Sequence, residues 1–156
     1  MLSSDPAVAE PAGAAPRIFS EMEIRHLLSL EVRRSTRYQD FLSVWLIQAI
    51  YPGARRDDLD AAIARRIAEM LRATDIVGII GSEILVLLVH TPDPDSTVIA
   101  ERIREQIEGE PLDLAPSPGR ISVRIGRASF PTDATSEGGL LSHAQAQLPT
   151  APPSST

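Results

Sequence analysis

The sequence contains no cysteine and no lysine, and only 4% of its residues are aromatic. Without cysteine the chain forms neither disulfides nor thiolate metal sites, and this composition fits the cytoplasm. No run of eighteen apolar residues is present, so we expect no membrane-spanning helix. Residues 1–17 lack the basic start and the apolar stretch of a secretory signal. The core, which has few aromatic residues to draw on, must be mostly aliphatic.

Every basic side chain except histidine is an arginine, and a GC-rich genome is the simplest explanation. The formal net charge is -6 at pH 7, which argues against general binding to nucleic acid. A local group of arginines can still hold a small phosphate ligand, because a guanidinium is a two-pronged phosphate donor. The charge pattern therefore excludes nucleic acid as a partner more firmly than it excludes a nucleotide.

A length of 156 residues is typical of one domain, and an apolar fraction of 43% is enough for a core. Residues 1–17 are rich in alanine, proline and serine, and residues 149–156 in proline and serine. Segments of this composition cannot bury a core, so we expect both to be disordered. The folded domain is predicted to span residues 18–148.

Apolar residues at helical spacing predict four helices, and short apolar or alternating runs predict four strands. The helices are expected at about residues 20–37, 57–72, from a cap at Asp95 or Ser96 to about 107, and 136–147. The strands are expected at about residues 41–50, 76–80, 84–89 and 120–130. The middle two strands flank Gly81-Ser82, and glycine is the residue that a two-residue hairpin turn needs.

This order of elements predicts an α+β sandwich, in which helices pack on one sheet that contains an antiparallel hairpin. Trp45 lies inside an apolar strand and is expected in the core. His26, His90 and His143 lack the spacing of metal ligands. The arginines of the last strand are expected on its solvent side or at the edge of the sheet, where charge prevents unwanted pairing. These are Arg120, Arg124 and Arg127.

The turn and its surroundings carry a resemblance. The turn reads Gly81-Ser82-Glu83-Ile84-Leu85, and "LEVRRSTRYQDFLSVWLI", "STVIAERIREQI" and "ISVRIGRASFPTDATSEGGLLSHAQAQL" occur around it in order. These stretches resemble the GGDEF domain family, the diguanylate cyclases, whose hairpin turn carries G-G-[DE]-E-F. The resemblance implies the nucleotidyl-cyclase-like sandwich: a central, mostly antiparallel sheet with a β-hairpin, flanked by helices.

Members of this family condense two GTP into cyclic di-GMP with two metal ions held by carboxylates. The family's D-[IL]-D sequence corresponds here to Gln48-Ala49-Ile50. Glu83 keeps one acid of the turn, but Ile84 replaces the next, and the F-K-x-I-N-D segment has no counterpart. Asp57 matches a guanine-reading aspartate but follows Arg56 instead of glycine. The resemblance thus implies a degenerate turn with no catalytic residue, no metal and no cofactor. Glu83 alone cannot hold two metal ions, and the simplest expectation is that it is an exposed acid in a hairpin turn.

The family's product site is better matched. Its mark is R-x-x-D placed five residues before the turn, and Arg72-Ala73-Thr74-Asp75 has that position relative to Gly81. A second arginine comes from an A-E-R-I-R-like helix, which gives Arg102. Arginine can fork onto a phosphate or a guanine, and a carboxylate can accept from guanine N1 and N2. An arginine in the last turn of a helix is also ordinary dipole matching, with Asp75 as its partner.

Loss of the catalytic residues and retention of the product site imply a receptor that binds cyclic di-GMP through Arg72, Asp75 and Arg102. Such a receptor would signal through ligand-linked homodimerisation or by docking onto a protein partner that carries the output. Other degenerate members suggest control of exopolysaccharide, biofilm or motility, by analogy alone. Two alternatives stay open: a nucleotide-independent interaction scaffold, and residual activity beside an intact cyclase.

Overall fold

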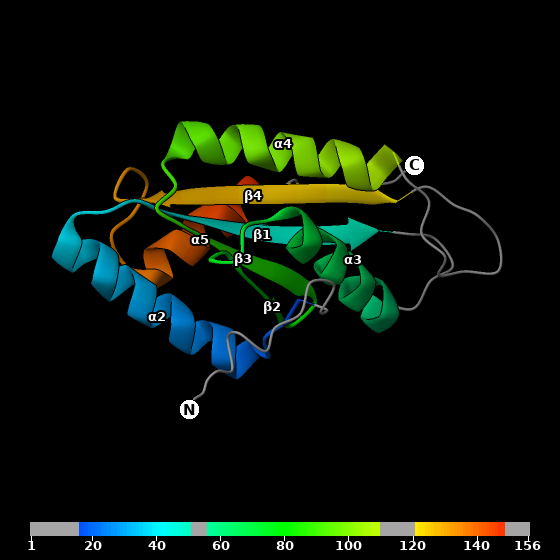
Figure 1. Ribbon diagram of the computed structural model, residues 1–156, viewed down its shortest axis with the longest axis horizontal. Coiled ribbons are helices and arrows are strands. Elements are labelled where there is room, and N and C mark those ends of the chain that lie inside the picture. Colours follow the sequence, from blue (N-terminus) through cyan, green and yellow to red (C-terminus); the bar gives the residue numbers. More distant parts are fainter. Residues whose placement is uncertain (1–15, 51–55, 110–120, 149–156) are drawn as a thin grey trace, which may run out of the picture.

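The computed structural model describes residues 16–50, 56–109 and 121–148 (Figure 1). In chain order these residues form α2 (Glu21–Tyr38), β1 (Leu42–Ile50), α3 (Arg56–Met70), β2 (Ile76–Ile80), β3 (Glu83–Val89), α4 (Asp93–Gly109), β4 (Ser122–Phe130) and α5 (Glu137–Gln147). The predicted order of helices and strands is confirmed. Residues 1–15 and 149–156, which we expected to be disordered, lie outside the described residues. Among the described helices, none is long and apolar enough to cross a membrane.

The four strands form one antiparallel sheet in the order β2-β3-β1-β4. Helices α3 and α4 cover one face of the sheet, and α2 and α5 cover the other, as Figure 1 shows. The two central strands, β1 and β3, are buried on both faces, so their sequences are nearly continuous apolar runs. The α+β sandwich expected from the order of the elements is confirmed.

Trp45 is fully buried on the α3–α4 face, as predicted, and its indole Nε1 donates to Ser96 Oγ at 2.8 Å. Ser96 is therefore a core residue inside α4, which begins at Asp93. The prediction of a cap at Asp95 or Ser96 was wrong. Pro94 does not delay the helix, because proline is tolerated in a first turn, where the backbone N–H has no helical partner.

Helix α3 ends at Met70, two residues earlier than predicted. The Leu71 N–H donates to the Ala68 carbonyl at 3.3 Å, which tightens the last turn. The Arg72 N–H then donates to Asp75 Oδ2 at 3.1 Å instead of continuing the helix. Arg72 thus lies in the α3–β2 loop, and its explanation as a residue of the last helical turn was wrong.

The outer edge of β2 is covered by the chain that precedes α2. Phe19 forms a parallel bridge to Gly78: its N–H donates to the Val77 carbonyl at 2.9 Å, and the Ile79 N–H donates to its carbonyl at 3.2 Å. A Cβ atom on Gly78 would lie 2.9 Å from the Phe19 carbonyl oxygen. Glycine is thus required for this close approach, and the bridge blocks pairing of β2 with another chain.

Helix α5 lies directly on β4. Its N-cap is Ser136, whose hydroxyl accepts from the Gly139 N–H at 3.0 Å. At the crossing point, a Cβ atom on Gly126 would lie 2.0 Å from the Ala144 carbonyl oxygen. The absence of a side chain at Gly126 therefore fixes how closely the helix can pack on the strand.

Candidate functional site

The hairpin turn between β2 and β3 is built as the sequence predicted. Ile80 pairs with Glu83, which leaves Gly81 and Ser82 as the two turn residues. Gly81 has a φ of 59°, and a positive φ at the first of two turn residues is the feature of a type II′ turn. Both turn residues are exposed.

The three residues after the turn enter β3. Ile84 and Leu85 are fully buried on opposite faces of the sheet, so neither reaches a ligand. Glu83 is half-buried, and Gln48 Nε2 of β1 donates to its Oε2 at 3.0 Å. The prediction that Glu83 is simply an exposed turn acid was wrong, because the register of β1 and β3 places the Gln48 amide beside it.

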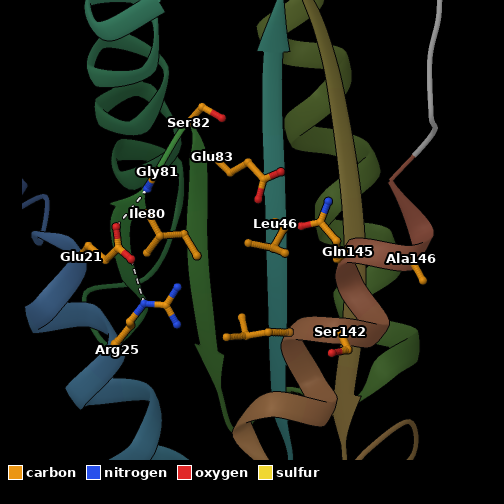
Figure 2. Close-up of a pocket in the computed structure, with 11 residues that line it drawn as sticks. Glu21, Arg25, Leu46, Ile80, Gly81, Ser82, Glu83, Ser142, Gln145 and Ala146 are labelled. Carbon is orange, nitrogen blue, oxygen red and sulfur yellow. Dashed lines mark hydrogen bonds and ion pairs between the residues drawn. The ribbon is translucent and has the colours of Figure 1, made fainter.

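An open cleft of about 650 Å³ lies beside the turn on the α2–α5 face (Figure 2). Glu21 of α2 reaches into it, and its carboxylate accepts from the Gly81 N–H at 3.1 Å and from Arg25 Nε at 3.0 Å. The Arg25 guanidinium, and after it the Gly81 N–H, lower the pKa of Glu21. Figure 2 shows Glu83 directed toward β1, and Ser142 and Gln145 of α5 on the opposite side of the cleft. The turn amide is thus already occupied by a carboxylate of the chain itself.

A second arrangement centres on Arg72. Its Nη2 donates to the Val89 carbonyl at 2.8 Å, to Thr91 Oγ1 at 2.9 Å and to Asp75 Oδ1 at 3.2 Å. Its Nε lies 3.4 Å from Asp75 Oδ2. Thr91, itself 3% exposed, donates to the Val89 carbonyl at 2.9 Å. These contacts fix the guanidinium between the α3–β2 loop and the end of β3.

The two partners differ sharply in exposure: the Arg72 side chain is 55% exposed and the Asp75 side chain 2%. Since Nε and Nη2 are engaged within the protein, Arg72 offers a ligand its Nη1 group and its planar face. The Asp75 carboxylate is covered and serves here to orient Arg72. The structure thus brings Arg72 and Asp75 together, as the spacing predicted, but only Arg72 is exposed to a ligand.

The third predicted residue, Arg102, is exposed on α4. Within the described residues it forms no hydrogen bond or ion pair with Arg72 or Asp75. Sequence reasoning missed Thr91, since a threonine after a strand carries no signal of an arginine contact. The Gln48–Glu83 pair was also missed, although alignment of the two strands in the correct register would have revealed it.

The model of the family described as "Diguanylate cyclase, GGDEF domain" matches residues 57–154. The chain belongs to the GGDEF family. A bifunctional diguanylate cyclase/cyclic di-GMP phosphodiesterase of Pseudomonas aeruginosa, MucR, is 26% identical over 129 residues, which cover 82% of this chain. The match covers only 19% of MucR, so the chain spans about one fifth of that relative's length.

Solved GGDEF domains share the fold. The GGDEF domain of YfiN (TpbB) from Pseudomonas aeruginosa is 25% identical, with a TM-score of 0.71 over 84% of this chain and 88% of that one. The coiled coil and GGDEF domain of DgcB from Caulobacter crescentus, solved in complex with c-di-GMP, is 11% identical, with a TM-score of 0.65 over 85% of this chain and 75% of that one. The GGDEF-like sandwich inferred from the sequence is confirmed.

The side chains at the turn do not fit a two-metal centre. Carboxylate oxygens are the ligands that such ions need, whereas Gln48 directs an N–H donor at the surviving carboxylate of Glu83. Within the described residues, no three histidine, cysteine, aspartate or glutamate side chains gather where they could share a metal ion. Asp57 lies in α3, and its side chain is outside the described part of the chain.

Proposed function

We propose that this chain is a catalytically inactive GGDEF domain that binds cyclic di-GMP in the cytoplasm through Arg72, with Asp75 and Arg102 contributing. The observation that carries the proposal is the fixed position of an exposed guanidinium. Arg72 is held by three groups of the protein while more than half of its side chain faces outward. These contacts order the guanidinium before a ligand arrives and leave its Nη1 side accessible.

Loss of cyclase activity is supported by the contact between Gln48 and Glu83. Joining two GTP molecules requires the triphosphate charge to be neutralised and a 3′-hydroxyl to be activated by metal ions. An amide that donates to the remaining carboxylate takes the place of one ligand and engages the other. Glu21 in addition occupies the Gly81 amide, a donor that a phosphate would otherwise use.

Binding of cyclic di-GMP is supported by the preorganisation of Arg72. Ordering a free arginine side chain costs up to about 2 kcal/mol of conformational entropy. Here Asp75, Thr91 and the Val89 carbonyl have already restricted the side chain before a ligand arrives. The Nη1 group can donate to a phosphate or to the acceptors of guanine, and the guanidinium plane can stack on the purine. In this reading Asp75 orients Arg72 rather than contacting guanine itself.

The position of Arg102 suggests how ligand binding could be coupled to a signal. It projects from α4 without a contact to Arg72, so a ligand that touches both must bridge them, or must take Arg102 from a second copy. Cyclic di-GMP carries two phosphates, and a stacked pair carries four negative charges, so several arginine surfaces are needed. Ligand-linked dimerisation or docking onto a partner follows from that need. By analogy with other degenerate members, the output would concern exopolysaccharide, biofilm or motility.

The test is calorimetric titration of the purified chain with cyclic di-GMP, with GTP as the control ligand. We expect micromolar or tighter binding, and a loss of about 10- to 100-fold on Arg72→Ala, since a hydrogen bond from a charged group is worth roughly 1.5–3 kcal/mol. Arg33→Ala is the matched control: Arg33 is exposed on α2 and has no ion pair within the described residues. The stoichiometry distinguishes a single ligand from a stacked pair.

Thr91 tests the preorganisation separately. Thr91→Val keeps the shape of the side chain but removes the acceptor for Arg72 Nη2, so cyclic di-GMP affinity should fall while Thr91→Ser retains it. If cyclic di-GMP gives no heat at millimolar concentration, the proposed receptor is wrong and the scaffold alternative is favoured. Formation of cyclic di-GMP from GTP by the purified chain would overturn the proposed inactivity.

A further inference from the structure

Residues 89–91, which end β3 and lead toward α4, supply two of the groups that hold Arg72. The Val89 carbonyl and Thr91 Oγ1 accept from Arg72 Nη2 at 2.8 Å and 2.9 Å. The Thr91 carbonyl in turn accepts from Ser43 Oγ of β1 at 2.8 Å. The position of the Arg72 guanidinium therefore depends on the backbone path through residues 89–91, which we call the β3 corner.

His90 lies between the two residues that accept from Arg72. Its φ is 55°, in the left-handed region. A residue with a Cβ atom adopts this conformation rarely, and keeps it only where surrounding contacts hold it. A change of φ at His90 would rotate the Val89 carbonyl relative to the Thr91 hydroxyl. The contact that holds His90 in place thus bears directly on how Arg72 is held.

That contact comes from the connection between α2 and β1. His90 Nδ1 pairs with Asp40 Oδ2, and within the described residues His90 has no other side-chain partner. The His90 side chain is 59% exposed, so packing does not fix it. Asp40 itself is well anchored: its Oδ1 accepts from the Phe41 N–H at 2.7 Å, and its Oδ2 accepts from Arg34 Nη1 at 3.2 Å.

The surroundings of Asp40 keep it ionised. Burial by itself would raise the pKa of Asp40, but the Phe41 N–H, Arg34 and His90 together lower it. Asp40 is therefore a carboxylate at neutral pH, and a carboxylate is a strong acceptor for the imidazole N–H. A chain of contacts thus runs from the end of α2 through Asp40 and His90 to the two groups that hold Arg72.

We propose that Asp40, acting through His90, positions the Arg72 guanidinium for its ligand, so that the connection between α2 and β1 controls the affinity of the Arg72 arrangement. The identity of the ligand rests on the proposed function, whereas the positioning of Arg72 does not. Asp40 and His90 are positioning residues in this scheme. If their contact only held the fold together, its loss would lower the stability of the chain and leave Arg72 ordered.

The deciding variant is His90→Gly. Glycine adopts a positive φ without steric cost, so the backbone path stays accessible while the contact with Asp40 is lost. His90→Asn is the conservative variant, because asparagine tolerates a positive φ and carries an N–H donor on a short side chain. Gln39→Gly is the matched control. Gln39, the C-cap of α2, has a φ of 53°, and its exposed side chain forms no hydrogen bond within the described residues.

The first measurement needs no ligand. The Nε–Hε resonance of Arg72 in the ¹⁵N-labelled full chain is assigned by its loss in Arg72→Ala. Its ¹⁵N–¹H NOE reports whether the guanidinium is ordered. We expect an ordered Arg72 Nε in the unmodified chain, in Gln39→Gly and in His90→Asn, and a mobile one in His90→Gly.

The second measurement is calorimetric titration of the same variants with cyclic di-GMP. Freeing an arginine side chain completely would weaken binding by up to about 30-fold, which is its conformational entropy expressed as a ratio of affinities. His90→Gly loosens the side chain only in part, so we expect a loss of about 3- to 10-fold. Gln39→Gly and His90→Asn should bind as the unmodified chain does.

The two measurements separate the positioning of Arg72 from the identity of the ligand. An ordered Arg72 Nε in His90→Gly overturns the inference, whatever cyclic di-GMP does. Equal affinities of His90→Gly and a cyclic di-GMP-binding unmodified chain overturn it as well, as does an equal loss in Gln39→Gly. Absence of binding by the unmodified chain refutes the proposed receptor instead, and the NOE then decides the positioning of Arg72 alone.

Discussion

Gln48→Glu is the substitution that most directly tests the structure of the altered turn. In the unmodified chain the Gln48 amide donates to Glu83 at 3.0 Å. Glutamate has nearly the same shape as glutamine, so the variant places two carboxylates side by side in a half-buried position. The hydrogen bond is lost and a repulsion between like charges replaces it. We therefore expect Gln48→Glu to lower the free energy of unfolding at pH 7.

The size of the effect follows from the separation of the two groups. Two unit charges about 4 Å apart interact by about 4 kcal/mol at an effective dielectric constant of about 20. Rotation of either side chain toward water reduces this, and the lost hydrogen bond adds about 1 kcal/mol. Arg124 of β4 lies directly across from Gln48 and offsets part of the repulsion, so we expect a net destabilisation of about 1–2 kcal/mol at pH 7. Because the repulsion raises the pKa of the pair in the folded state, the loss is small below the ordinary glutamate pKa of about 4.3 and grows as pH rises through the raised value.

Urea denaturation at pH 7 and pH 4 measures both predictions. The matched control is the double variant Gln48→Glu/Glu83→Gln, which exchanges amide and carboxylate and should recover most of the lost stability. If Gln48→Glu unfolds within about 0.5 kcal/mol of the unmodified chain at pH 7, the two side chains do not meet and the reasoning fails. If the double variant is no more stable than Gln48→Glu alone, the loss does not come from the charge pair.

Two further predictions concern packing and pH. Gly126→Ala should lower the free energy of unfolding by at least about 2 kcal/mol, because its Cβ atom would lie 2.0 Å from the backbone of α5. Gly138→Ala is its control: it lies in the first turn of α5 with open space around it and should raise stability by about 0.5–1 kcal/mol. Equal effects in urea denaturation would contradict the close contact of α5 with β4. The Gly81 amide should report the titration of Glu21, whose pKa is lowered by Arg25 and then by the Gly81 N–H itself. A folded pKa below the unfolded value means that the contact persists at pH 5 and is lost as pH falls through the folded pKa. An NMR midpoint for the Gly81 amide at or above about 4.3 would contradict this.

The elements that depend on local chemistry could be predicted from the sequence. The hairpin turn needed only Gly81 between two β-rich runs, and Trp45 lay in an apolar strand. Two helix ends were predicted at the wrong residues, the end of α3 and the start of α4, and side-chain contacts determine both. Asp75 captures the Arg72 amide and so ends α3 early, and Trp45 recruits Ser96 into the core from 51 residues away. Neither contact can be predicted from the spacing of apolar residues in the sequence.

The contacts of the candidate site likewise divide into local ones, which the sequence predicts, and long-range ones, which it does not. Arg72 and Asp75 are three residues apart, so their pairing follows from local spacing. The anchor at Thr91 joins residues 19 positions apart, and the contact of Gln48 with Glu83 joins residues 35 apart. Both depend on how β3 and β1 align. A one-residue shift in that alignment would move every side chain of the strand to the other face, so composition alone cannot supply such contacts.

The bridge at Phe19 has a mechanical consequence. The Phe19 backbone is hydrogen-bonded to the middle of β2, and the Glu21 carboxylate, two residues later, accepts from the Gly81 N–H just after the end of that strand. The segment that enters α2 is thus attached to the β2–β3 hairpin at two points, one on β2 through Phe19 and one at the turn through Glu21. Because Ile24 and Leu28 bury the inner face of α2, the helix is held in its orientation, and the Glu21 carboxylate stays at the turn amide for as long as this packing persists.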